Sequence, residues 1–221
     1  MTLADNYGAE TLRITEVFLS LQGESDSVGW PTVFVRLTGC PLRCNYCDTS
    51  YAFTGGETRR IDHILAQVAE FDVRHVCVTG GEPLAQKGVL HLLAALCDAG
   101  YVVSLETSGA LDVSAVDPRV VKVMDLKTPY SGEAGRNRYE NIDFLGEQDQ
   151  VKLVIANADD YAWAKAVIER YALTERCEVL LSPCFGQIEP RELAGWILRD
   201  RLDVRFQLQL HKLLWGDEPG R

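Results

Sequence analysis

The chain has 221 residues, of which 47% are apolar and 24% are charged, and its formal net charge is −10. The apolar fraction excludes a disordered chain, and the length is sufficient for one domain with a sizeable core. Because a negative surface repels phosphates, we expect no nucleic-acid partner.

The sequence carries no signal for a membrane or for secretion, so we expect a cytoplasmic protein. The most apolar stretch, 89–105, falls short of the roughly 18 residues that a membrane span needs, and His91, Asp98 and Gly100 interrupt it. Residues 1–10 hold two acidic residues and no basic one, unlike a secretory signal. Thiols stay reduced in the cytoplasm, so the seven cysteines indicate a metal or reactive site rather than disulfides.

Short β-branched runs alternate with helical patterns along the chain. They predict strands at 13–21, 32–38, 75–79, 102–106, 120–126, 151–156, 178–182 and 204–208. Apolar residues at helical spacing predict helices at 61–71, 90–97, 161–171 and 189–199. Strand–helix–strand order implies right-handed crossovers, so the predicted fold class is α/β with a mainly parallel sheet. About six of its strands could curl into a barrel or part of one.

Chemistry in such a sheet is expected where the carboxyl ends of the strands meet the following loops. The unusual residues of this sequence fall at these predicted strand ends. They are a cysteine segment after Thr38, the run 79–83, Glu106, Lys127, and the pair Ser182 and Pro183.

Three cysteines, Cys40, Cys44 and Cys47, follow a predicted strand with the spacing C-x3-C-x2-C. One alternative is a helical stripe of small core residues, but Pro41 and the leading Gly39 suit a helix poorly. A second alternative is a zinc site, although no second cysteine pair is present to complete it. The third is a four-iron cluster, in which three thiolates leave one iron open to bind a small chelating molecule.

The cysteine segment resembles the cluster loop of radical S-adenosylmethionine (SAM) enzymes, in which an aromatic residue, here Tyr46, precedes the last cysteine. The resemblance implies that 39–50 is the cluster loop and that its three cysteines hold a catalytic 4Fe-4S cluster whose open iron binds SAM. The run Gly80-Gly81-Glu82 is similar to the superfamily's glycine motif, which grips the SAM amino group. By its residues alone, this run is equally an ordinary turn between a strand and a helix.

Over its whole length the sequence resembles the 7-carboxy-7-deazaguanine synthase family. The resemblance implies one radical SAM domain at 1–221, with a C-terminal extension at 212–221. The implied fold is a partial, open TIM-type barrel with a reduced helix complement, in agreement with the weak helical pattern between 108 and 150. It also implies that 209–212 belongs to the final strand and places His211 over the substrate.

The same resemblance assigns the residues of the site. The residues that contact the substrate are Leu21, Gln22, Gly23, Glu24, Arg36, Thr79 and His211. The residues that contact SAM are Tyr46, Cys47, Asp48, Gly80, Gly81, Glu82, Glu106, Ser108, Asp125, Lys127, Ser182, Pro183, Cys184 and Phe185. The hydroxyl of Thr49 corresponds to a magnesium ligand, since Mg²⁺ takes oxygen ligands and keeps several waters.

Plainer roles remain open for several of these residues. Glu24 and Thr49 can cap turns, Lys127 can be a surface lysine, and His211 can be a core or surface histidine. Arg36 lies in a predicted buried strand and needs an anionic partner, and the sequence shows none, which favours a ligand.

The implied reaction converts 6-carboxy-5,6,7,8-tetrahydropterin to 7-carboxy-7-deazaguanine with release of ammonia, in queuosine and 7-deazapurine biosynthesis. The cofactors are the 4Fe-4S cluster, SAM and Mg²⁺, and the partners are an electron donor such as flavodoxin or ferredoxin and a second copy of the chain in a homodimer. Two alternatives are a glycyl-radical-enzyme activase, which shares the cysteine spacing, and a zinc-stabilised binding module without catalytic activity.

Overall fold

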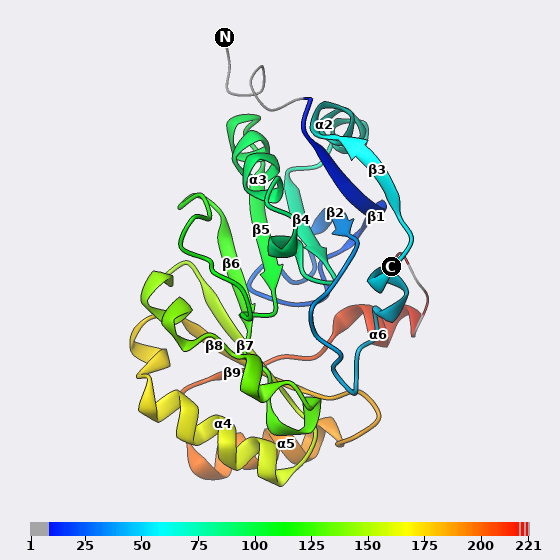
Figure 1. The fold of residues 1–221 in the computed structure, drawn as a ribbon. Helices are drawn as coiled ribbons and strands as arrows, with labels where there is room; N and C mark the ends of the chain where they lie inside the picture. Colours follow the sequence, from blue (N-terminus) through cyan, green and yellow to red (C-terminus); the bar gives the residue numbers. More distant parts are fainter. Residues whose placement is uncertain (1–8, 217, 219, 221) are drawn as a thin grey trace.

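The computed structural model describes residues 9–216, 218 and 220, which form one nine-stranded mixed sheet (Figure 1). The strands are β1 (Thr11–Leu21), β2 (Pro31–Leu37), β3 (Glu57–Arg60), β4 (His75–Gly80), β5 (Val102–Thr107), β6 (Val121–Asp125), β7 (Gln150–Ile155), β8 (Glu178–Pro183) and β9 (Arg205–Phe206). They lie in the order β3-β1-β2-β4-β5-β6-β7-β8-β9. β1 pairs antiparallel with β2 and β3, whereas every neighbouring pair from β2 to β9 is parallel.

Five α-helices accompany the sheet in the described part of the chain. They are α2 (Ile61–Ala69), α3 (Val89–Asp98), α4 (Ala158–Arg170), α5 (Pro190–Asp200) and α6 (Leu210–Trp215). Local residue chemistry sets the start of α4 and of α5. The Asn157 side chain accepts a hydrogen bond from the backbone of Asp160 and caps α4, and Pro190 fits the first turn of α5.

Four of the helices, α2 to α5, pack on one face of the sheet in two groups, which Figure 1 shows above and below the middle of the molecule. One apolar core joins α2 and α3 to β1, β2, β4 and β5, and a second joins α4 and α5 to β6, β7 and β8. The side chains of β7 alternate between the second core and the opposite face of the sheet. Val151, Leu153 and Ile155 are buried in the second core, while Lys152 and Val154 face a cavity on the other side of the sheet.

The predicted α/β class, the mainly parallel sheet and its open form are confirmed. The stretch 108–150 contains only short 3-10 helices besides β6 and the start of β7, as the weak helical pattern predicted. These 3-10 helices are η3 (Pro129–Ser131), η4 (Ala134–Arg136) and η5 (Tyr139–Phe144), and the others are η1 (Ser50–Phe53), η2 (Pro83–Ala85) and η6 (Leu173–Glu175).

One prediction about the strands is wrong, and one strand was not predicted. The final strand does not include 209–212, because the sheet ends at the two-residue β9 and Gln209 instead precedes the first residue of the helix α6. Leu210 N donates to Gly23 O (2.9 Å), so this backbone binds the segment after β1 rather than a strand. The edge strand β3 was also missed, because its sequence Glu-Thr-Arg-Arg is polar and carries no apolar alternation.

Among the described residues, no helix combines the length and apolar character that crossing a membrane requires.

We predict that Leu153→Ala lowers the free energy of unfolding by about 2–5 kcal/mol, because the side chain is fully buried and its removal leaves a cavity. Urea denaturation followed by circular dichroism measures this change. Leu198→Ala is the control, since Leu198 on α5 is 77% exposed and its loss should cost less than about 0.5 kcal/mol. Equal effects of the two substitutions would contradict the assignment of the core.

Candidate active site

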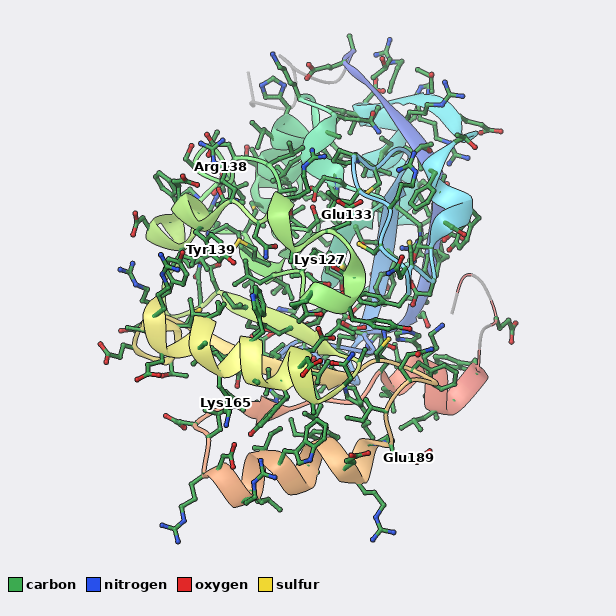
Figure 2. All side chains as sticks on the ribbon, turned by 60° about the horizontal axis from the view of Figure 1, so that its bottom comes forward. Lys127, Glu133, Arg138, Tyr139, Lys165 and Glu189 are labelled. Carbon is green, nitrogen blue, oxygen red and sulfur yellow. The ribbon has the colours of Figure 1, made fainter. Side chains whose placement is uncertain are left out.

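A cavity of about 390 Å³ lies at the carboxyl ends of the parallel strands, a size typical of small-molecule sites. Its wall takes residues from the ends of β2, β4, β5 and β6, from β7, from the segment after β1 and from α6. Lys127, which follows β6 and lines the cavity, lies near the middle of the molecule in Figure 2. The cavity therefore sits where chemistry is expected in a sheet of this kind.

The three cysteines of the C-x3-C-x2-C segment are half-buried, are not in disulfides and all line this cavity. Contacts with two other segments hold the backbone around them. Gly39 N donates to Ala52 O (2.8 Å), and Asn45 Nδ2 donates to Tyr130 O (2.8 Å). The loop is irregular rather than helical, so the helical stripe is excluded.

Burial raises the pKa of all three thiols, that of Cys44 to about 11, and the nearby ammonium of Lys127 opposes the rise. The thiols are therefore protonated at neutral pH. Since only the thiolate is a strong metal ligand, iron that binds here must displace protons.

The donor set fits a cluster better than a single ion. Among the described residues, no three His, Cys, Asp or Glu side chains converge closely enough to hold one metal ion. The thiolates of a four-iron cluster each bind a different iron, so they need not converge on one point. Beside the thiols, Tyr46 Oη and Asp125 Oδ1 are buried without a hydrogen-bond partner, which leaves polar groups for a bound molecule.

The glycine loop after β4 lies directly against the cysteine loop. A Cβ at Gly81 would lie 2.3 Å from Gly39 O and 2.8 Å from the Cβ of Cys40, so no side chain fits there. Glu82 N donates to Gly39 O (2.8 Å), which ties the two loops together through their backbones. The glycine is needed for this close approach.

The Glu82 carboxylate does not reach the cavity, in contrast to the SAM contact that the resemblance assigns to the motif. It is fully buried and accepts hydrogen bonds from Thr107 Oγ1 (3.0 Å to each oxygen), from Ser108 N (2.7 Å) and from the Ser108 hydroxyl. Leu84 N donates a further bond of 3.0 Å. Glu82 thus joins the end of β4 to the end of β5, and its motif meets the cavity only through Gly80 and Gly81.

Arg36 points from β2 into the cavity and has a protein partner that the sequence analysis missed. Its Nε donates to Glu16 Oε1 (2.7 Å), and Tyr51 Oη donates to the same oxygen (2.7 Å). Glu16 stands opposite Arg36 in the antiparallel β1–β2 pair. Because the sequence does not reveal this register, it could not show the ion pair. The Nη1 and Nη2 donors of Arg36 bind no described residue.

Polar side chains line the cavity from three neighbouring segments. Glu106 at the end of β5 accepts from Thr79 Oγ1 (3.0 Å) and from Gln22 Nε2 (3.4 Å). Glu24 accepts from Gln209 Nε2 (2.6 Å) on one oxygen and from Lys152 Nζ on the other. These groups form a set of acceptors and donors on one side of the cavity.

His211 covers the segment after β1. A Cβ at Gly23 would lie 2.2 Å from His211 Nδ1, so the imidazole rests directly on the glycine backbone. The contact places His211 on the cavity wall, although it comes from a helix and not from the predicted strand.

The end of the cluster loop carries a carboxylate and a hydroxyl in contact. Thr49 Oγ1 donates to Asp48 Oδ1 (2.8 Å), and Lys212 Nζ lies 3.5 Å from Asp48 Oδ2. Burial alone would raise the pKa of Asp48, but the bond from Thr49 and the charge of Lys212 outweigh it and lower this pKa. An anionic carboxylate and a hydroxyl oxygen thus face the cavity together.

The structure brings most of the predicted site residues into this one cavity. Three of them do not line it: Glu82, Ser182 and Pro183. Ser182 and Pro183 are buried at the end of β8, and the two residues that follow, Cys184 and Phe185, reach the wall in their place.

Besides Thr107 at the end of β5, four polar residues on the wall were not assigned from the sequence: Lys152, Gln187, Gln209 and Lys212. The sequence did contain a signal that Lys152 has a functional role, because it is a charged residue within the apolar run Val-Lys-Leu-Val-Ile of a predicted buried strand. The other three lie in loops or in a short helix, where a polar residue needs no special explanation.

Comparison with known proteins identifies the class of this enzyme. A family model described as the radical SAM superfamily matches residues 34–125, which include the cysteine loop and the glycine loop. The chain is an enzyme of the radical SAM superfamily.

Its relatives define the family more narrowly. The 7-carboxy-7-deazaguanine synthase of Chlorobaculum tepidum is 49% identical over 210 residues, covering 94% of this chain and 96% of the relative. The synthase of Koribacter versatilis is 40% identical and covers 94% and 98%. The chain belongs to the 7-carboxy-7-deazaguanine synthase family. The crystal structure of QueE from Escherichia coli, at 22% identity, has the same fold, with a TM-score of 0.79 over 96% of this chain and 99% of that one.

We predict that Gly81→Ala reduces iron uptake at the three cysteines at least about tenfold, because the new Cβ would push the glycine loop away from Gly39 O. Iron and sulfide are measured after anaerobic reconstitution. Gly195→Ala is the control, since a Cβ there meets nothing within 4 Å. Normal iron content in the Gly81 variant would show that the contact between the loops does not shape the site.

Proposed function

We propose that the chain converts 6-carboxy-5,6,7,8-tetrahydropterin to 7-carboxy-7-deazaguanine with loss of ammonia, a step in queuosine and 7-deazapurine biosynthesis. One observation carries the proposal. A single cavity has three thiols on one side and, on the other, an arginine with two uncommitted guanidinium nitrogens beside a row of hydrogen-bonding side chains. This arrangement suits a cofactor and a small polar, anionic substrate held next to each other.

The cysteine side would hold the cofactors. Cys40, Cys44 and Cys47 would bind the 4Fe-4S cluster, and SAM would lie between the glycine loop and the residues after β5, β6 and β8. When bound and reduced, these groups would supply the radical chemistry that begins with removal of a hydrogen atom from the substrate. The ring of Tyr46, with Lys127 Nζ at 5.9 Å from its centre, offers a flat surface for the adenine.

The other side would bind the pterin. The Nη1 and Nη2 groups of Arg36 would pair with the substrate carboxylate, and Glu16 and Tyr51 fix the orientation of the guanidinium. Gln22, Glu24 and Glu106 would accept hydrogen bonds from the N–H groups of the pterin ring. His211 would lie over the ring and exclude water from it.

Magnesium is part of the proposal. The Thr49 hydroxyl and the anionic Asp48 beside it offer oxygen atoms at the cavity wall, which are the ligands that Mg²⁺ prefers. With Mg²⁺ bound, Thr49 would help to orient the substrate carboxylate during ring contraction.

An electron donor and a second copy of the chain complete the proposed function. Reduction would come from an external donor such as flavodoxin or ferredoxin. We further propose that the enzyme is a cytoplasmic homodimer that acts on a small molecule and binds no nucleic acid. Size-exclusion chromatography with light scattering tests the dimer, and turnover with each purified donor tests the source of electrons.

Two other functions predict different results in one anaerobic assay with SAM, dithionite and the carboxytetrahydropterin. A 7-carboxy-7-deazaguanine synthase gives the deazaguanine chromophore. An activase of glycyl-radical enzymes cleaves SAM without forming this product, and a zinc-stabilised module takes up no iron. Either of the last two results would overturn the proposed function.

We predict that Cys40→Ala, Cys44→Ala and Cys47→Ala each reduce product to background, because each removes one iron ligand. Product absorbance and iron content measure the effect. Cys97→Ala is the control, since Cys97 lies on α3 away from the cavity and its loss should change stability only. Turnover in any of the first three variants would exclude the three-thiolate site.

We predict that Thr49→Ala raises the Mg²⁺ concentration needed for half-maximal turnover at least about tenfold, while SAM cleavage changes little. A Mg²⁺ titration of both reactions separates the two effects. Thr54→Ala, an exposed threonine at the end of η1, is the control. An unchanged Mg²⁺ response in the Thr49 variant would remove Thr49 as a ligand.

A further inference from the structure

Lys152 is the one lysine of β7, and the sheet directs it into the cavity instead of the core. Its neighbours Val151 and Leu153 pack under the helices, so the side chain of Lys152 lies on the opposite face. The side chain is only 13% exposed, and its ammonium contacts a carboxylate oxygen of Glu24. A charge buried to this extent needs compensation from its surroundings.

The ammonium of Lys152 lies between the two sides of the cavity. Glu24 on the substrate side binds it directly, and Asp125 Oδ2 on the cofactor side lies 3.7 Å away. Lys127 Nζ in turn lies 2.9 Å from the same Asp125 oxygen. The four side chains all line the cavity and form a row of alternating charge.

Glu24 keeps hydrogen-bonding capacity toward the cavity. Each oxygen of a carboxylate can accept two hydrogen bonds, and one oxygen here accepts from Lys152 and the other from Gln209 (2.6 Å). One acceptor position on each oxygen is left. A reduced pterin carries N–H groups on its pyrimidinone ring, and an ionised carboxylate is their strongest partner.

We infer that Lys152 is a positioning residue of the synthase reaction, which holds the Glu24 carboxylate ionised and aimed into the cavity so that Glu24 binds the N–H groups of the pterin. The inference rests on the proposed function, because it takes the substrate to be a reduced pterin. Lys152 acts through Glu24 and need not touch the reacting atoms.

The chain contains a second buried lysine that shows what a purely structural ion pair looks like. Lys122 Nζ lies 3.0 Å from Asp149 Oδ2, and both side chains are buried. Neither residue lines the cavity, since Lys122 shares the core side of β6 with Met124. The two lysines are similarly buried and paired, and they differ in the face of the sheet that they occupy.

The shifts in the pKa values of Glu24 and Lys152 agree with a positioning role for Lys152. Burial raises the pKa of Glu24, but Lys152, Gln209 and His211 outweigh it, so that its pKa is lowered. Burial lowers the pKa of Lys152, and the carboxylates of Glu24, Asp125 and Glu106 outweigh it and raise this pKa. The positive charge of Lys152 also acts to lower the pKa of Asp48 and of Tyr46. Without Lys152, burial would dominate, and Glu24 would take up a proton at higher pH.

The test is the pH dependence of kcat/KM for the pterin in Lys152→Met, Lys152→Arg and Lys122→Met. Lys152→Met should lower kcat/KM about 100-fold at neutral pH, chiefly through KM, and the loss should deepen at least about tenfold as the pH falls from about 8 to about 6. Lys152→Arg keeps the charge and should keep the wild-type pH profile. Lys122→Met should unfold more easily but also keep that profile.

A second readout does not need the loaded enzyme. In the 13C-glutamate-labelled chain without cluster or SAM, the carboxyl resonance of Glu24, identified by its loss in Glu24→Gln, should titrate below its ordinary range. In Lys152→Met it should titrate above that range. A wild-type pH profile or an unchanged Glu24 titration in Lys152→Met would overturn the inference.

Lys152→Met leaves a buried carboxylate without its cation and could fail to fold, so a double variant completes the test. Glu24→Gln removes that charge. If Lys152 acts through Glu24, adding Lys152→Met to Glu24→Gln should lower kcat/KM less than about threefold, and a further loss of about tenfold or more would overturn the inference. Absence of product from the wild-type enzyme would instead overturn the proposed function.

Discussion

The contact between two backbone loops determines the geometry of the site. The loops after β2 and β4 touch at Gly39 and Gly81 with no side chain between them, and a hydrogen bond from Glu82 N to Gly39 O fixes their spacing. The Glu82 carboxylate then anchors this unit to the end of β5. The cysteines, which come from an irregular loop, thereby gain a fixed position at the edge of a rigid sheet. A catalytic or metal-binding site needs this kind of support, because its side chains must be held close to the geometry that the chemistry requires.

The second constraint is electrostatic. The cavity contains several ionised groups in a half-buried space, and each is tolerated because another charge or donor lies close to it. Arg36 pairs with Glu16, Glu24 with Lys152, and Asp125 with Lys127. These pairs leave specific atoms uncommitted, such as the Nη groups of Arg36 and Asp125 Oδ1. The same network that stabilises the charges therefore prepares the cavity for a polar ligand.

Much of this could be predicted from the chain. The alternation of apolar strands and amphipathic helices predicted the parallel sheet, and the unusual residues were correctly expected at the strand ends. The helix α6 and the edge strand β3 were missed for a common reason. Both are short. β3 has no apolar alternation, and the six residues of α6 are too few for the spacing of Leu210, Leu213 and Leu214 to establish a helix, so contacts with distant segments determine their conformation.

The sequence by itself determined the sheet, the three-cysteine loop and the glycine loop, because their signals are local: residue spacing, burial patterns and residues that suit a tight backbone. Only the tertiary structure decided that Glu16 is the partner of Arg36, that Glu82 turns away from the cavity and that Lys152 reaches Glu24 across 128 positions of the chain. Strand register and sheet curvature create these contacts. They depend on pairings between segments far apart in the sequence, and no local pattern of residues encodes them.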